Sequence, residues 1–324
     1  MCNTPRVTSP TPTEPVVKSV WQLPEDGAER LVRDGFFAGE GFLAPDMLAA
    51  VTAELAEWTN VPAINGYGCI FQHDDALLQN LGLYSRSALH LAVDERVLDF
   101  MERHYGEPAL LTKCEYRRAV STKEEMILHA DGMDDVSIYV YLGGVSTARG
   151  ATALMRGSQR IGIAENGGYL QIPLEVQAKH DFPLIEMAGG PGLCLFFNVN
   201  CWHKRTATQV PGREILWLAY SPLSRAENCV ELVFARNSLF GLNDRQLAAL
   251  GLKLPVFRGR RAEDFRMSRN LEPASLTFIP DRMLVKTLLH RNVQRLRAAV
   301  PKPVKRRIQR LLGLNRPAAR KKIG

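Results

Sequence analysis

Short β-strand patterns separated by glycine-rich turns restrict the fold of this chain more than any other feature. Six segments between residues 109 and 221 have the apolar content of strands: 109–117, 126–130, 136–142, 152–155, 193–197 and 214–221. Glycine clusters at 143–144, 167–168 and 189–192 stand between them, and tight turns favour glycine. Short strands at this spacing predict an all-β barrel or sandwich.

Helical patterns flank the strand region. Apolar residues recur every three or four positions in 47–58 and lie on one side of 94–104, as amphipathic helices require. A further helix is expected at 243–250, with Asn243 as its N-cap. The sequence therefore predicts a mainly β protein whose N-terminal helices pack on one side of the β core.

Charge divides the chain into parts. The protein has 324 residues and a net charge of +7, yet residues 282–324 contain fourteen Lys and Arg and no acidic residue. The remainder is therefore net acidic, with 27 basic residues against 34 acidic ones. Residues 1–18 are rich in Pro, Thr and Ser, which predicts disorder. We expect a disordered segment at 1–18, a catalytic-sized domain at 19–281 and a basic amphipathic helical tail at 282–324.

The basic tail has three interpretations. Its apolar stripe packs on the acidic body, or residues 282–312 bind an anionic membrane surface, or the tail binds nucleic acid. No aromatic residues interleave the basic ones, which makes nucleic acid the least favoured partner. Six scattered cysteines without CxxC pairs and a start without a secretory signal predict a cytoplasmic protein. Membrane binding by the tail would make it peripheral at the inner membrane surface.

Two histidines and an aspartate form a candidate metal site. His129 and Asp131 are separated by one residue at the end of a predicted strand, so both side chains point to the same face. His203 follows the apolar strand at 193–197. Two histidines and one carboxylate suit a redox-active iron with open coordination positions.

Arg213 indicates a second ligand. It begins the predicted strand at 214–221, and its face of that strand also carries Ile215 and Trp217. A guanidinium on an inward face needs an anionic partner, because a buried unpaired charge is costly. Its planar fork suits a carboxylate, so a bound dicarboxylate is a natural candidate.

The motifs resemble those of the phytanoyl-CoA dioxygenase family of iron(II)- and 2-oxoglutarate-dependent oxygenases. The similarity covers roughly residues 30 to 221, and the segments that carry it are Asp34-Gly35-Phe36, Gly41-Phe42-Leu43, His129-Ala130-Asp131-Gly132, the turn at 150–159, His203 and Arg213. Gln159 stands where the family more often has histidine.

The resemblance implies a double-stranded β-helix (jelly-roll, cupin-like) core. It further implies Fe(II) on His129, Asp131 and His203, 2-oxoglutarate paired with Arg213, and O2 as the other co-substrate. Related halogenases lack the carboxylate ligand, so Asp131 favours hydroxylation.

Three further residues are candidates for the co-substrate site. Relatives often place a serine near the position of Thr206. Thr206 or Ser221 is therefore expected to supply a hydroxyl to the co-substrate. Tyr141 either touches the co-substrate or packs in the core. The neighbouring Arg117 and Arg118 are interpreted as a surface pair at a strand end, with contact to an anionic substrate as the alternative.

The leading hypothesis is thus a dioxygenase that hydroxylates a small organic, lipid-linked or glycan-linked substrate and releases succinate and CO2. A non-catalytic β-helix protein that binds metal and ligand as a sensor or accessory subunit is the alternative. A membrane-surface adaptor acting through the basic tail is a third interpretation.

Overall fold

The computed structural model describes residues 20–56, 69–72, 75–131, 135–161, 171–224, 232, 234–252, 256–257 and 260–261. The segment expected to be disordered (1–18) and the basic tail (282–324) lie outside these residues. Within the described part of the chain, no helix is both long and apolar enough to cross a membrane.

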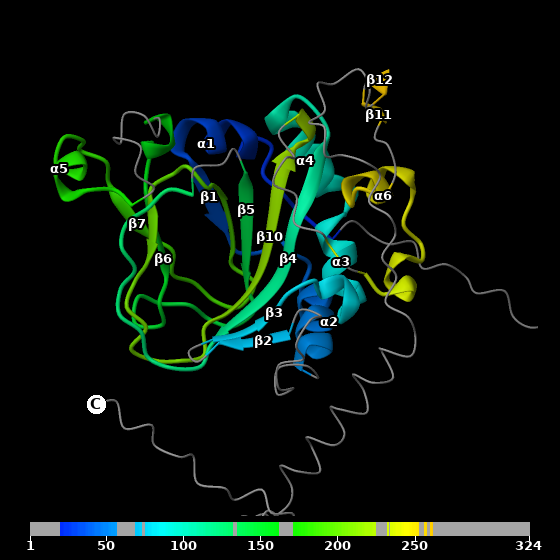
Figure 1. The fold of residues 1–324 in the computed structure, drawn as a ribbon, viewed down its shortest axis with the longest axis horizontal. Helices are drawn as coiled ribbons and strands as arrows, with labels where there is room; N and C mark the ends of the chain where they lie inside the picture. The colour runs from blue at the N-terminus through cyan, green and yellow to red at the C-terminus, as the bar shows by residue number, and fades with distance from the viewer. Residues whose placement is uncertain are drawn as a thin grey trace, which may run out of the picture.

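Two antiparallel sheets form the core. The major sheet has seven strands in the order β1 (Phe36–Gly39), β8 (Cys194–Asn198), β5 (Val136–Tyr141), β10 (Glu214–Pro222), β4 (Ala109–Ala119), β3 (Asp75–Leu78) and β2 (Cys69–Gln72). The minor sheet has the order β7 (Leu184–Glu186), β6 (Thr152–Met155) and β9 (His203–Arg205). Figure 1 shows β6 and β7 facing the major sheet. The predicted double-stranded β-helix core is confirmed.

Helices cover the outer side of the major sheet, away from β6 and β7 (Figure 1): α2 (Pro45–Ala56), α3 (Arg86–Ala92), α4 (Glu95–Tyr105) and α6 (Asp244–Ala249). The remaining elements are α1 (Gly27–Asp34), α5 (Leu174–Gln177), the 3-10 turns η1 (Leu81–Leu83), η2 (Ser158–Arg160) and η4 (Arg236–Leu239), and the short hairpin of β11 (Val256–Phe257) and β12 (Arg260–Arg261). The predicted helices are confirmed, with ends shifted by one or two residues.

Alternation along β10 separates two cores. Leu216 and Leu218 join the large cluster under the helices, whereas Ile215 joins a second cluster that contains Leu154 of β6 and Phe197 of β8. Successive strand residues point to opposite faces, so one strand contributes to both cores. The inner face of β10 is therefore the face that looks toward the minor sheet.

The predicted strand at 126–130 is wrong as a regular strand. The segment makes only isolated bridges, from His129 to Gln171 and to His203, and Met126 N–H donates to the carbonyl of Arg205 at 2.9 Å. Met126 and Ile127 are 43% and 63% exposed. Leu128 and Ala130 are buried, but the segment pairs with β9 and with residue 171 only through isolated bridges and forms no continuous ladder.

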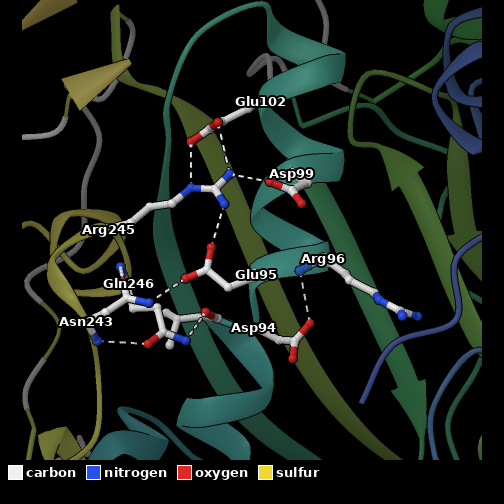
Figure 2. Close-up of polar contacts among 9 residues, drawn as sticks. Asp94, Glu95, Arg96, Asp99, Glu102, Asn243, Arg245 and Gln246 are labelled. Atoms are coloured by element: carbon white, nitrogen blue, oxygen red, sulfur yellow. Dashed lines mark hydrogen bonds and ion pairs between the residues drawn. The ribbon is translucent and has the colours of Figure 1, made fainter. Parts of the chain in front are cut away.

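Polar contacts attach α6 to α4. The Arg245 guanidinium lies among three acidic side chains of α4 (Figure 2), 2.5 Å from Glu95, 2.7 Å from Asp99 and 2.9 Å from Glu102. Asn243 caps α6 in a capping box with Gln246, as predicted for Asn243. These contacts fix the last described helix to the outer layer, away from the minor sheet.

Candidate active site

Backbone pairing brings the two histidines of the candidate metal site together. His129 N–H donates to the His203 carbonyl at 3.0 Å, and His203 N–H donates to the His129 carbonyl at 2.8 Å. The ring centroids consequently lie 4.3 Å apart. Asp131 follows, with carboxylate oxygens 3.7 Å from His129 Nε2 and 3.9 Å from His203 Nε2. One donor atom from each residue lies within 4.8 Å of the others.

Hydrogen bonds assign the tautomer of both rings. His129 Nδ1 is 2.9 Å from the Ile127 carbonyl, and His203 Nδ1 is 2.8 Å from the Cys201 carbonyl. A carbonyl only accepts, so each Nδ1 carries the proton. Each Nε2 therefore offers its lone pair toward Asp131, in the arrangement that orients metal-binding histidines.

The charge state also suits a metal. Burial and, to a smaller extent, the nearby charge of His129 lower the pKa of His203 to about 4, while Asp131 opposes the shift. His203 is thus neutral at neutral pH and free to ligate. His129 and Asp131 are only partly buried, so one side of the cluster is open. Two imidazoles and a carboxylate with an open side fit Fe(II).

The three residues lie in the wall of a pocket of about 220 Å³. The rest of the wall comes from both sheets and from the segment before His129: Arg117, Ala119, Lys123, Met126, Tyr139, Thr152, Lys204, Arg205, Arg213, Ile215 and Trp217. The candidate metal site and Arg213 therefore share one cavity.

Arg213 precedes β10 and is held by the turn after residue 149. Its Nη1 donates to the Gly150 carbonyl, an uncharged acceptor, so the guanidinium charge stays available to an anion in the pocket. Gly150 has φ +76°, and a Cβ there would overlap Thr208 Oγ1. Only glycine fits this position comfortably, and its carbonyl orients the arginine.

Three predicted co-substrate residues are not among the residues that line the pocket. The Tyr141 hydroxyl donates to Thr152 Oγ1 at 2.8 Å and is fully buried behind that residue. Thr206 Oγ1 donates to the Thr147 carbonyl at 2.9 Å. Ser221 donates to Asp135 and lies eight positions along the chain from Arg213, roughly 26 Å at the usual rise of a strand. The structure brings together the triad and Arg213 but not Thr206, Ser221 or Tyr141.

The structure places Arg117 and Arg118, interpreted as a surface pair, on opposite sides of β4, although their side chains are similarly exposed, at 38% and 39%. Arg117 lines the pocket, whereas Arg118 pairs with Glu214 at 3.5 Å. Adjacent residues of β4 face opposite sides, so the two side chains cannot share one environment. Alternation from Arg117 to Ala119 would have revealed this, since both line the pocket.

The segment before His129 supplies pocket residues that the sequence pattern missed. Lys123 and Met126 line the cavity, although neither lies in a regular strand. Lys123 reaches it because its backbone forms a bridge with Thr208. No periodic signal marks such a position.

Comparisons with known proteins support the fold. No family model matches the chain, and no curated protein matches it by sequence. Two solved structures of EctD from S. alaskensis are similar: the form with bound Fe has 18% identity and a TM-score of 0.52 over 64% of this chain and 83% of EctD. The form with 2-oxoglutarate and 5-hydroxyectoine has 20% identity and a TM-score of 0.51 over 66% and 82%.

A third similar structure is the epimerase SnoN in complex with Fe3+, alpha ketoglutarate and nogalamycin RO. It has 20% identity and a TM-score of 0.50 over 62% of this chain and 84% of SnoN. At these identities the likeness establishes a common fold. The chain thus shares its double-stranded β-helix with proteins whose structures hold iron and 2-oxoglutarate.

Proposed function

We propose that this protein is an Fe(II)- and 2-oxoglutarate-dependent dioxygenase that hydroxylates a small organic, lipid-linked or glycan-linked substrate. The observation that carries the proposal is the convergence of His129, Asp131, His203 and Arg213 on one pocket. The shared fold with EctD and SnoN, which bind iron and 2-oxoglutarate, adds support.

Each residue has a role in this proposal. His129, Asp131 and His203 would hold Fe(II), because their donor atoms converge and both Nε2 lone pairs are free. Arg213 would bind the far carboxylate of 2-oxoglutarate through its planar fork. Together, bound iron and 2-oxoglutarate supply the oxygen-activating chemistry that yields succinate and CO2.

The pocket wall would position the substrate and limit water. Tyr139, Ile215 and Trp217 form a largely apolar side of the cavity. Tyr139 packs edge-on against Phe197, which in turn packs edge-on against the ring of His203. This aromatic row supports the rear of the metal site, so His203 keeps its orientation while the open side remains available to ligands.

Membership in the phytanoyl-CoA dioxygenase family, a cytoplasmic location and membrane binding by residues 282–312 are further hypotheses that rest on the sequence. The membrane hypothesis predicts that full-length protein floats with anionic liposomes and that protein ending at Asp281 does not. Equal flotation of the two would exclude this role for the tail.

Succinate release tests the proposed function directly. Purified protein with Fe(II), ascorbate and 2-oxoglutarate should release succinate slowly even without substrate. His129→Ala should abolish both the release and the binding of one equivalent of metal. His90→Ala is the control, because His90 lies in α3 on the outer side of the major sheet and should change neither. Unchanged succinate release in His129→Ala would show that the assignment is wrong.

A further inference from the structure

The pocket carries an excess of positive charge. Five basic residues line it, against Asp131 as the acidic one among the described wall residues: Arg117, Lys123, Lys204, Arg205 and Arg213. Under the proposed function, Asp131 binds iron and Arg213 binds 2-oxoglutarate. A divalent cation and a dicarboxylate cancel each other's charge, so the remaining wall stays cationic and favours an anionic substrate.

The basic residues of the pocket wall differ in the ion pairs and hydrogen bonds that they already make within the protein. Lys204 pairs with Glu125 at 2.9 Å. Arg205 donates to Thr208 Oγ1 at 2.7 Å and to the Glu124 carbonyl at 3.0 Å. Arg117 keeps unsatisfied donor capacity, since its ion pair with Glu115 is long, at 3.3 Å. Its Nε is buried and has no hydrogen-bond partner among the described residues.

Trp217 holds the Arg117 guanidinium in place. The guanidinium carbon lies 4.3 Å from the centre of the Trp217 ring, and Lys113 Nζ lies 3.9 Å from the same centre. Trp217 is itself fixed, because its Nε1 donates to Ser137 Oγ at 3.0 Å and Tyr139 packs edge-on at 5.5 Å. Stacking leaves the edge of the guanidinium outside the Glu115 contact available to an oxyanion.

Strand pairing places Arg117 near Arg213 on the same face of the sheet, opposite a residue two positions further along the chain. Arg117 lies opposite Ile215 in the pairing of β4 with β10, and Ala119 N–H donates to the Arg213 carbonyl. The two arginines are thus diagonal neighbours on one face, roughly 7–8 Å apart at the backbone. Such a spacing provides two separate anion positions in a single cavity.

We propose that Arg117 is the substrate-recognition residue of this pocket and that the substrate carries a carboxylate or phosphate group that binds its guanidinium. This proposal rests on the proposed function. It assigns the two arginines different partners, Arg213 the co-substrate and Arg117 the substrate.

Ligand retention tests the assignment without turnover. Anaerobic protein loaded with Fe(II) and 2-oxoglutarate is mixed with a small-molecule extract of the cells that produce it, and retained compounds are identified by mass spectrometry after ultrafiltration. The variants are Arg117→Gln and Arg117→Lys, with Arg118→Gln as the matched control because Arg118 faces away from the pocket and pairs with Glu214. Phosphatase treatment of a second portion of the extract distinguishes phosphate from carboxylate compounds.

Wild type and Arg118→Gln should retain the same anionic compounds. Arg117→Gln should bind them roughly tenfold to a hundredfold more weakly, the loss of a charge-assisted contact, and Arg117→Lys should restore part of the affinity. Binding of 2-oxoglutarate should be unchanged in every variant, which also shows that Arg117→Gln is folded. Loss after phosphatase treatment would identify a phosphate, and persistence would identify a carboxylate.

Three results would overturn the proposal: no anion is retained by wild type, the retained set is the same in Arg117→Gln, or Arg117→Gln weakens 2-oxoglutarate binding as strongly as Arg213→Ala does. The last result would place Arg117 in the co-substrate site. Failure of the proposed function is separate, because it appears as wild-type protein that neither binds Fe(II) and 2-oxoglutarate nor releases succinate.

Discussion

Replacing Gly150 by alanine should weaken both the fold and the arginine site. Gly150 has φ +76°, and an L-residue in the left-handed region costs roughly 1–2 kcal/mol. The added Cβ would overlap Thr208 Oγ1 and lie 3.4 Å from both Arg205 Cγ and the Thr206 carbonyl oxygen. Thr208 is 1% exposed, so the overlap cannot be relieved toward solvent and adds about 1–3 kcal/mol.

Gly212 provides a matched control. Its φ is +104°, and a Cβ added there meets nothing within 4 Å. In Gly212→Ala the free energy of unfolding should therefore fall only by the backbone cost, about 1–2 kcal/mol. In Gly150→Ala it should fall by roughly 2–5 kcal/mol, because the steric overlap adds to that cost. Unfolding in urea, followed by circular dichroism, measures both free energies.

The second readout concerns Arg213. Because the Gly150 carbonyl accepts from Arg213 Nη1, a displaced residue 150 should weaken 2-oxoglutarate binding and leave metal binding intact. Calorimetric titration of the metal-loaded protein checks this. If Gly150→Ala and Gly212→Ala lose the same stability and keep the same 2-oxoglutarate affinity, the steric argument is refuted.

Three further predictions follow from the site and the outer layer. Arg213→Ala should weaken 2-oxoglutarate binding by roughly tenfold to a hundredfold, measured by titration, with metal affinity unchanged; equal 2-oxoglutarate affinity would contradict its role. The pKa of His203 is lowered to about 4 by burial, so as pH falls from about 6.5 the unfolded chain takes up a proton first. The unfolding free energy of the metal-free protein, measured in urea at each pH, should then fall by up to about 3 kcal/mol by pH 4. If His203→Gln shows the same decrease with pH, another group is responsible. Arg245→Ala should reduce the unfolding free energy by about 1–2 kcal/mol at low salt, and less at high salt, while succinate release stays unchanged; an effect independent of salt would argue against the ion pairs with α4.

The positions of strands along the chain were predictable from the sequence where the strand is buried over its whole length. The strands near Val136, Cys194 and Glu214 were recognisable because each is buried on at least one face and alternates or runs apolar. The segment at 126–130 was misassigned as a regular strand: Leu128 and Ala130 are buried, Met126 and Ile127 are exposed, and the backbone makes only isolated bridges. Apolar periodicity indicates which residues are buried. It does not show whether the backbone forms a continuous ladder with a neighbouring strand.

Local chemistry and tertiary placement contributed different parts of the site. The sequence by itself determined the donor types at His129, Asp131 and His203 and the charge at Arg213, since these depend only on residue identity and strand spacing. Only the tertiary structure decided that Thr206 and Ser221 do not line the pocket, where each hydroxyl instead donates to a group that is distant along the chain. Only the pairing of β4 with β10 brought Arg117 to the pocket beside Arg213. The neighbours of a side chain across a sheet depend on the register of the two strands, and the sequence of one strand alone does not determine that register.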